Sequence, residues 1–244
     1  MTYCVGLMLD KGLVFMSDTR TNSGVDNIST FRKMFSFNVE GERDITLMTA
    51  GNLATTQALI SLLEERRFEH SERDPDILTA PTMFQVARLV GETLREVISR
   101  HADSGQRADA AFNATVILGG QIKGGKPCLF MVYPEGNFIE ASEDTPFFQI
   151  GETKYGRPIL LRAYDRTMGF EEAVKLLLVS FDSTIKANLS VSLPLDVKTY
   201  AEGGFAPHHE LRVEPDDAYF HEISHGWGVA LRNAFQKLPD FKFK

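Results

Sequence analysis

The sequence of 244 residues predicts an α+β fold, a four-layer α/β/β/α sandwich in which two antiparallel sheets lie between two layers of helices. Apolar runs typical of strands occur in groups, and segments with apolar residues at helical spacing also occur in groups. This segregation disfavours a doubly wound parallel sheet, in which strands and helices would alternate. No linker, repeat or low-complexity stretch divides the chain, so we expect a single domain covering residues 1–244.

The first group contains four strands. Residues 2–9 and 13–17 are predicted to form an antiparallel hairpin around a turn at 10–12, which places residues 2 and 18 at the same end of the two arms. The polar stretch 19–29 is predicted to be a loop. The other two strands of this group are expected at 33–39 and 45–50.

Two helices follow, then a run of strands, two more helices, a strand pair and a terminal helix. The first helix is predicted at 54–67 from its apolar spacing, with Asn52 as its N-cap. The remaining helices are expected at 82–100, 157–164, 171–187 and 224–238. The remaining strands are expected at 112–118, 127–133, 137–141, in a segment ending at Gly151, and at 196–200 and 209–213.

Composition excludes several classes of function. A net charge of −7 argues against a nucleic-acid or membrane partner bound through overall charge. No signal peptide is visible and no apolar run approaches the roughly 18–20 residues that span a bilayer, so a cytoplasmic location is expected. Cys4 and Cys128 lack metal spacing and are expected to be buried free thiols.

Neither a metal nor another cofactor is expected. His221 and His225 have helical i, i+4 spacing, and His208 is followed by His209, but the surrounding residues do not provide a carboxylate-supported metal site. Surface histidines are the favoured interpretation. The tail after the last predicted helix carries Phe241 and Phe243, which either pack on their own domain or dock on a neighbouring subunit.

Residues near the beginning of the chain indicate a catalytic site. If Met1 is removed, Thr2 carries a hydroxyl and a free α-amine, and that amine can act as the base that activates the hydroxyl. Lys33 could lower the pKa of the amine by like-charge repulsion, and Asp18 could hold Lys33 in place. Gly51, between a strand end and a helix start, could offer its backbone N–H to an oxyanion. Taken singly, each is more often an ordinary structural residue; the order and spacing of all four point to catalysis.

The pattern resembles that of the proteasome β-type subunits, and within that superfamily the bacterial Anbu (ancestral beta subunit) group. The likeness covers nearly the whole chain. The residues that carry it are Thr2, 18–21, Lys33, 50–54, 127–130, 134–136 and 150–151, with 2–7 and 29–34 pointing to the Anbu group.

The resemblance implies the fold of N-terminal-nucleophile hydrolases, with Thr2 as nucleophile, Lys33 and Asp18 as its supports and the Gly51 amide as oxyanion donor. It implies that Thr21, Asn22, Thr49 and Leu53 line a cleft for a peptide or amide substrate. It also implies a homo-oligomer, either ring-like or open and helical. A docking surface for an ATP-driven unfoldase is not recognisable in the sequence.

One part of the sequence departs from the family pattern. Proteasome subunits carry an Asp-x-x-Ser-Gly-Gly stretch after their fourth helix, but in the comparable stretch here, residues 186–193, the acid appears as Asn188 and the glycine pair is absent. Where relatives have a serine after Gly151, this chain has Glu152. We expect Asn188, Ser190 and Glu152 to substitute for that part of the proton network.

Three hypotheses therefore follow for the function. The first is a self-assembling threonine-type peptidase. The second is an amidase of the same chemistry that acts on a non-protein amide. The third is a catalytically weak assembly or scaffold protein, which is favoured if Met1 is retained, because the Thr2 nitrogen is then an amide and cannot act as a base.

Overall fold

The computed structural model describes residues 1–22, 28–67, 75–102 and 112–243. The helices are α1 (Leu53–Glu65), α2 (Met83–Ala102), α3 (Arg157–Ala163), α4 (Phe170–Ala187) and α5 (Ala218–Gln236). The strands are β1 (Tyr3–Leu9), β2 (Gly12–Asp18), β3 (Arg20–Asn22), β4 (Ile28–Thr30), β5 (Met34–Val39), β6 (Arg43–Gly51), β7 (Ala114–Ile122), β8 (Cys128–Val132), β9 (Phe138–Glu140), β10 (Phe147–Gly151), β11 (Leu195–Ala201) and β12 (His209–Val213).

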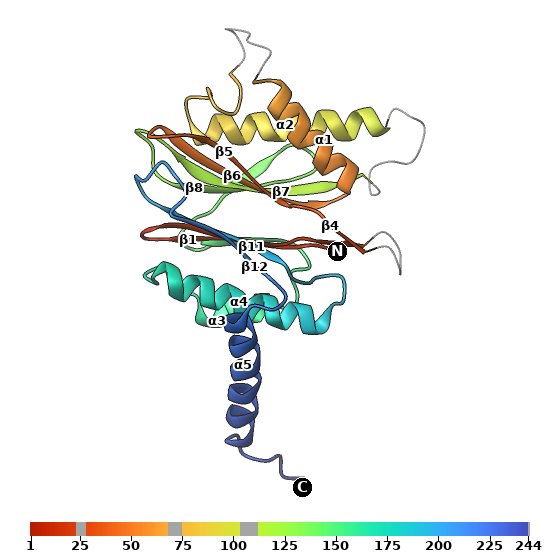
Figure 1. Cartoon of the computed structure of the whole chain (residues 1–244), viewed down its shortest axis with the longest axis vertical. Helices are drawn as coiled ribbons and strands as arrows, with labels where there is room; N and C mark the ends of the chain where they lie inside the picture. Colours follow the sequence, from red (N-terminus) through yellow and green to blue (C-terminus); the bar gives the residue numbers. More distant parts are fainter. Residues whose placement is uncertain (23–27, 68–74, 103–111, 244) are drawn as a thin grey trace.

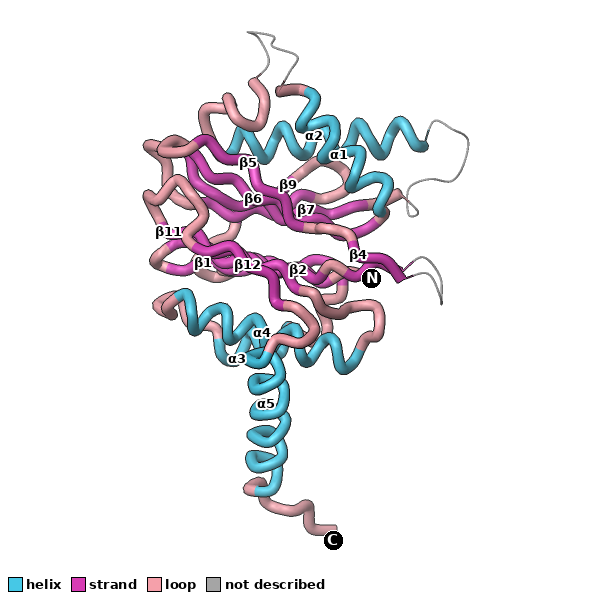
Figure 2. Tube along the Cα trace, in the orientation of Figure 1, coloured by secondary structure: helices cyan, strands magenta, loops and turns pink. Residues whose placement is uncertain are grey.

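The predicted four layers are confirmed (Figure 1). One antiparallel sheet has the strand order β10-β1-β2-β11-β12, and the other has the order β5-β6-β7-β8-β9. Figure 2 shows α1 and α2 over the second sheet, α3 and α4 over the first, and the two sheets facing each other. The N-terminus lies at the edge of the space between the sheets, beside β4.

Apolar clusters fill each of the three spaces between the layers. Alternate side chains of β2 belong to two of these clusters. Val14 and Met16 pack towards α4, while Leu13 and Phe15 pack towards the second sheet. Since both faces of the strand are buried, the run is apolar throughout and lacks the polar alternation of a solvent-facing strand.

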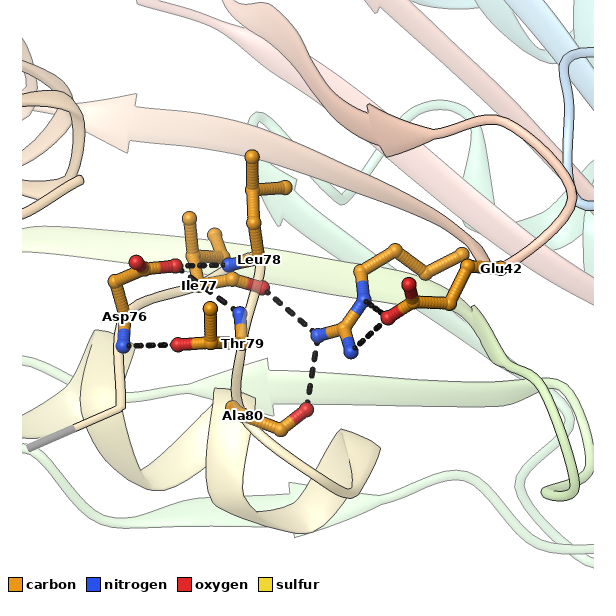
Figure 3. A network of polar contacts seen from close by, with 7 residues as sticks. Glu42, Asp76, Ile77, Leu78, Thr79 and Ala80 are labelled. Carbon is orange, nitrogen blue, oxygen red and sulfur yellow. Dashed lines mark hydrogen bonds and ion pairs between the residues drawn. The ribbon is translucent and has the colours of Figure 1, made fainter. Parts of the chain in front are cut away.

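A polar network fixes the chain that leads into α2 against the start of β6 (Figure 3). The buried guanidinium of Arg43 donates to the carbonyl of Ala80 over 2.8 Å. The carboxylate of Asp76 accepts the backbone N–H groups of Leu78 and Thr79. These bonds satisfy the backbone of a turn that would otherwise leave buried polar groups without partners.

Two predictions about the elements are wrong. The stretch predicted as a loop at 19–29 contains β3 and the start of β4, which pair with each other as a separate two-stranded sheet. The last helix begins at Ala218 rather than 224, because Asp217 caps it by accepting the N–H of Phe220 over 2.7 Å. Phe220 is buried and anchors this first turn.

Helix α5 runs away from the layered body, with the C-terminus at its far end (Figure 1). The tail beyond it does not pack on the layered body: Phe241 and Phe243, whose rings contact each other, are 80% and 92% exposed, and Phe235 in the last turn is 77% exposed. Among the residues that the structure describes, no helix is both long and apolar enough to cross a membrane.

The two sheets are also joined by a buried ion pair. Lys198 of β11 donates to the carboxylate of Asp44 of β6 over 2.6 Å and to the hydroxyl of Ser36 over 3.0 Å. Both charged side chains are essentially inaccessible to solvent, at 0% and 1% exposure. Removing one partner would leave the other charge buried and uncompensated, which costs more than the pair itself contributes.

We therefore expect Lys198→Ala to lower the free energy of unfolding by about 3–5 kcal/mol. Arg212→Ala, which removes the more exposed Arg212–Asp196 pair on the neighbouring strand, should cost about 1 kcal/mol or less. Urea denaturation followed by circular dichroism measures both. Equal losses in the two variants would contradict the assigned difference between the pairs.

Candidate active site

The backbone of Thr2 is held on both sides. The hairpin register pairs Cys4 with Ser17, so the chain start and Asp18 meet as predicted, and the N–H of Tyr3 donates to the Asp18 carboxylate over 2.9 Å. On the other side, the N–H of Glu152 donates to the Thr2 carbonyl over 2.7 Å. These bonds fix Thr2 at the end of β1, between β2 and β10.

Gly151 allows this close approach. It has φ = +84°, and a Cβ there would lie 1.9 Å from the Thr2 carbonyl oxygen. A side chain would therefore be strained and would also push Thr2 out of place.

Lys33 and Asp18 form a buried ion pair beside the chain start. The Lys33 ammonium donates to Asp18 Oδ1 over 2.8 Å and to the carbonyl of Arg20 over 2.6 Å. Burial raises the pKa of Asp18, while the charge and hydrogen bond of Lys33 oppose that rise. The same ammonium acts on the terminal amine, which is at Met1 in this chain: burial lowers the pKa of the amine, and repulsion by Lys33 lowers it further.

A cavity of about 770 Å³ opens at this pair. Its lining includes the expected Thr2, Lys33, Gly51, Thr21, Thr49 and Leu53. The other lining residues are Met1, Arg32, Ala50, Asn52, Ala54, Thr56, Gln57 and Gly151. The structure thus brings six of the residues singled out in the sequence to one hollow, and Asp18 supports it from the buried side of Lys33.

Gly51 stands where β6 gives way to α1. Its φ is +124°, and a Cβ would lie 2.3 Å from the carbonyl oxygen of Asn113, so only glycine fits without a shift of the backbone. Asn52 follows as the predicted N-cap, and its side chain accepts the N–H of Thr55 over 3.1 Å. Because residues 51–54, 56 and 57 line the cavity, the first turn of α1 faces it.

Glu152, Asn188 and Ser190 form a second cluster, which does not line the cavity. The Asn188 amide donates to the Glu152 carboxylate over 2.9 Å, and Asn188 Oδ1 accepts the N–H of Ser190 over 2.9 Å. The cluster meets Thr2 through the backbone bond from Glu152. The negative charge of Glu152 raises the pKa of the terminal amine, as a smaller influence than burial or Lys33.

The remaining expected residues are placed as follows. Asn22 belongs to β3, where it is paired with Ile28, and its side chain lies outside the described part of the chain. Cys4 is a buried free thiol, as expected, whereas Cys128 is free but only partly buried. In the described ranges, no group of three or more metal-binding side chains is close enough together to hold an ion.

Arg32 and Gln57 line the cavity but were not predicted to do so. Gln57 lies one turn after Leu53 on α1, so the i, i+4 spacing from an expected cleft residue could have identified it. Arg32 precedes Lys33, and its position depends on the tertiary structure, since the sequence alone does not fix its direction.

We expect Gly151→Ala to lower the free energy of unfolding by more than about 3 kcal/mol, because backbone strain and the clash with Thr2 add together. Gly41→Ala is the matched control, since Gly41 also has a positive φ but open space around it. It should cost about 1–2 kcal/mol. Urea unfolding compares them, and equal losses would contradict the clash.

The amino-terminal pKa gives a second prediction. In the folded chain it should lie below its ordinary value of 8.0, and Lys33→Met should raise it, since the repelling charge of Lys33 influences this amine more than the opposing charge of Asp18 does. In the parent chain, the folded state binds fewer protons than the unfolded state at pH values between the folded and the unfolded pKa of the amine. The free energy of unfolding should therefore rise with pH through that window. The pH dependence of amine acetylation, native and in urea, measures it; a native value at or above 8.0 would contradict the prediction.

Comparison with known proteins agrees with this architecture. The family model described as proteasome subunit matches residues 2–192. An Anbu (Gly-1) mutant from Hyphomicrobium sp. strain MC1 is 48% identical, with a TM-score of 0.93 over 100% of both chains. Anbu from Yersinia bercovieri is 48% identical, with a TM-score of 0.91 over 99% of this chain and 100% of that one.

A third solved structure, the helical assembly of the Anbu complex from Pseudomonas aeruginosa, is 45% identical, with a TM-score of 0.91 over 99% of this chain and 98% of that one. No curated protein matches the chain. Because the family model covers most of the chain and the Anbu structures match along its whole length, the chain belongs to the proteasome subunit family and, within it, to the Anbu (ancestral beta-subunit) group.

Proposed function

We propose that this chain is a single-domain threonine-type N-terminal hydrolase of residues 1–244, which cleaves peptide or related amide bonds after removal of Met1. The observation that carries the proposal is the buried Lys33 ammonium, held by Asp18 beside the chain start and facing a cavity that Thr2 also lines. A buried cation at this position favours a neutral terminal amine, which is the form that can accept a proton.

In the proposed mechanism, the α-amine of Thr2 takes the proton from its own hydroxyl as Oγ attacks the substrate carbonyl carbon. The carbonyl oxygen becomes an oxyanion, which the Gly51 amide and the Lys33 ammonium stabilise. The protonated amine then gives its proton to the leaving nitrogen, and the C–N bond breaks to leave an ester on Thr2. Water hydrolyses this ester with the same amine as base.

Removal of Met1 has two effects in this mechanism. It converts the Thr2 nitrogen from an amide to an amine, and it clears a side chain from the cavity, because Met1 is one of the lining residues. Met1 is 60% exposed, which is consistent with access by an aminopeptidase.

The cleft and the supporting network are assigned by position. We propose that Thr21, Thr49 and Leu53 contact the substrate, since all three line the cavity, and that Asn22 does so from β3. We propose that Glu152 holds the Thr2 backbone and keeps a negative charge near its amine. Asn188 holds the Glu152 carboxylate, and Ser190 holds Asn188, through the hydrogen bonds that join them.

We also propose that the protein assembles with copies of itself in a ring-like or open helical arrangement. The relative from Pseudomonas aeruginosa is described as a helical assembly, and the exposed apolar residues of α5 and the tail support such contacts here. A scaffold with weak catalysis is the alternative if Met1 is retained, since an acylated Thr2 nitrogen cannot act as base. An amidase for a non-protein amide would use the same chemistry.

Thr2→Ala in processed protein should lower turnover of any cleaved amide by at least about 10³-fold, because it removes the nucleophile and leaves the fold unchanged. Thr2→Ser keeps a hydroxyl and should retain measurable activity. Intact mass after exposure to a peptide epoxyketone gives a second readout, with a label expected on the parent chain and on Thr2→Ser but not on Thr2→Ala. Unchanged turnover in Thr2→Ala would exclude this nucleophile, and complete retention of Met1 in protein from its native cell would favour the scaffold.

A further inference from the structure

The charged side chains described in the lining of the cavity at Thr2 are cationic, in a chain whose net charge is −7. Among the described residues its lining includes two cations, Arg32 and Lys33, and no aspartate or glutamate. The first turn of α1 also opens into it and contains no acidic residue, so the positive end of the helix dipole is not neutralised there. The electrostatic environment therefore favours an anion.

The charge available to a ligand is that of Arg32. Lys33 is already paired with Asp18 and bonded to the carbonyl of Arg20. Arg32, by contrast, is exposed and has no carboxylate within ion-pair distance in the described part of the chain. It also borders a smaller hollow of about 210 Å³ that includes the carboxylates of Asp196 and Glu210. Asp196 is occupied by two guanidinium nitrogens of Arg212, at 2.7 and 3.0 Å, and Glu210 forms no ion pair with Arg32 in the described part of the chain.

The backbone of Arg32 is fixed at the cavity edge. The N–H of Phe31 donates to the carbonyl of Thr19 over 2.8 Å, and the carbonyl of Lys33 accepts the N–H of Thr49 over 2.9 Å. Both neighbours of Arg32 are thus anchored, one to the end of β2 and the other to β6. A guanidinium placed in this way can bind a carboxylate through two parallel N–H···O bonds.

We infer that Arg32 selects substrates that carry a carboxylate close to the scissile amide. The inference rests on the proposed function for the reaction itself, but binding of the carboxylate does not require turnover. Two sources of the carboxylate are chemically possible: an acidic side chain on the acyl side of the bond, or a carboxylate on the leaving side. Gln57, which also lines the cavity, adds an amide donor for either.

The test is equilibrium binding to protein lacking Met1, measured by NMR titration with two matched pairs of ligands. One pair is an acetylated tripeptide amide ending in glutamate or in glutamine, for the acyl side. The other is acetyl-leucine coupled to 4-aminobenzoate or to 4-aminobenzamide, for the leaving side. The anionic member of at least one pair should bind about tenfold more tightly, and the preference should weaken as salt is added.

Arg32→Gln should abolish the preference, and Arg32→Glu should reverse it in favour of the neutral ligand. Arg88→Gln is the matched control, since it removes the same charge from α2, outside the cavity, and should leave the preference unchanged. Circular dichroism establishes that each variant is folded. A preference in the first pair assigns the acyl side, and one in the second pair assigns the leaving side.

Equal affinity within both pairs, no measurable binding of any ligand, or a preference that persists in Arg32→Gln would overturn the inference. The proposed function fails by a separate result, namely that Thr2 is not modified by a threonine-reactive peptide boronate or epoxyketone. A carboxylate preference without modification of Thr2 would leave Arg32 as an anion-binding residue of a protein that is not a threonine hydrolase.

Discussion

The structure around the beginning of the chain depends on one oxygen atom, Asp18 Oδ1. It accepts the N–H of Tyr3, which begins β1, and the ammonium of Lys33, which precedes β5. Asp18 itself ends β2, so one buried carboxylate joins the two sheets where the chain begins. A buried carboxylate without a cation would take up a proton and lose its hold on the N–H group. The position of Thr2 therefore depends on the charge of Lys33, quite apart from any role of Lys33 in catalysis.

A second buried pair, between Lys198 and Asp44, crosses the same space between the sheets. The two pairs have different surroundings. Lys198 is enclosed and its remaining contact is the hydroxyl of Ser36, whereas Lys33 lies on the wall of a cavity. The enclosed pair can fix how the sheets register on each other, and the other pair keeps a cation next to space that a ligand can enter. One pair is therefore enclosed within the layered body, and the other lies beside a cavity.

Features that depend on residues near one another in the chain were predictable from the sequence. The hairpin that brings Thr2 to Asp18 follows from a turn, and the start of α1 follows from Asn52. The pairing of β3 with β4 was missed, because their polar residues are also typical of a loop. Lys33 and Gly51 were placed with the help of the family resemblance rather than by local pattern alone.

Contacts between distant segments could not be read from the sequence. The approach of Gly151 to the Thr2 carbonyl and the bond between Asn188 and Glu152 depend on how β10 and the end of α4 meet β1. Arg32 is a similar case, since its place at the cavity edge follows from backbone bonds to β2 and β6. Spacing along the chain carries no information about such contacts until the layers are assembled.

The departure from the family pattern at Asn188 has a physical explanation in this cluster. Its amide donates to a carboxylate of the same chain, Glu152, which is only 8% exposed. An aspartate at position 188 would bring a second carboxylate to within about 3 Å of the first, and two like charges at that distance cannot both stay ionised. With glutamate at 152, an amide at 188 supplies the donor that this carboxylate needs. The negative charge is therefore kept beside Thr2 but on the other segment, so the asparagine is accounted for by charge balance and does not by itself indicate that the site is silent.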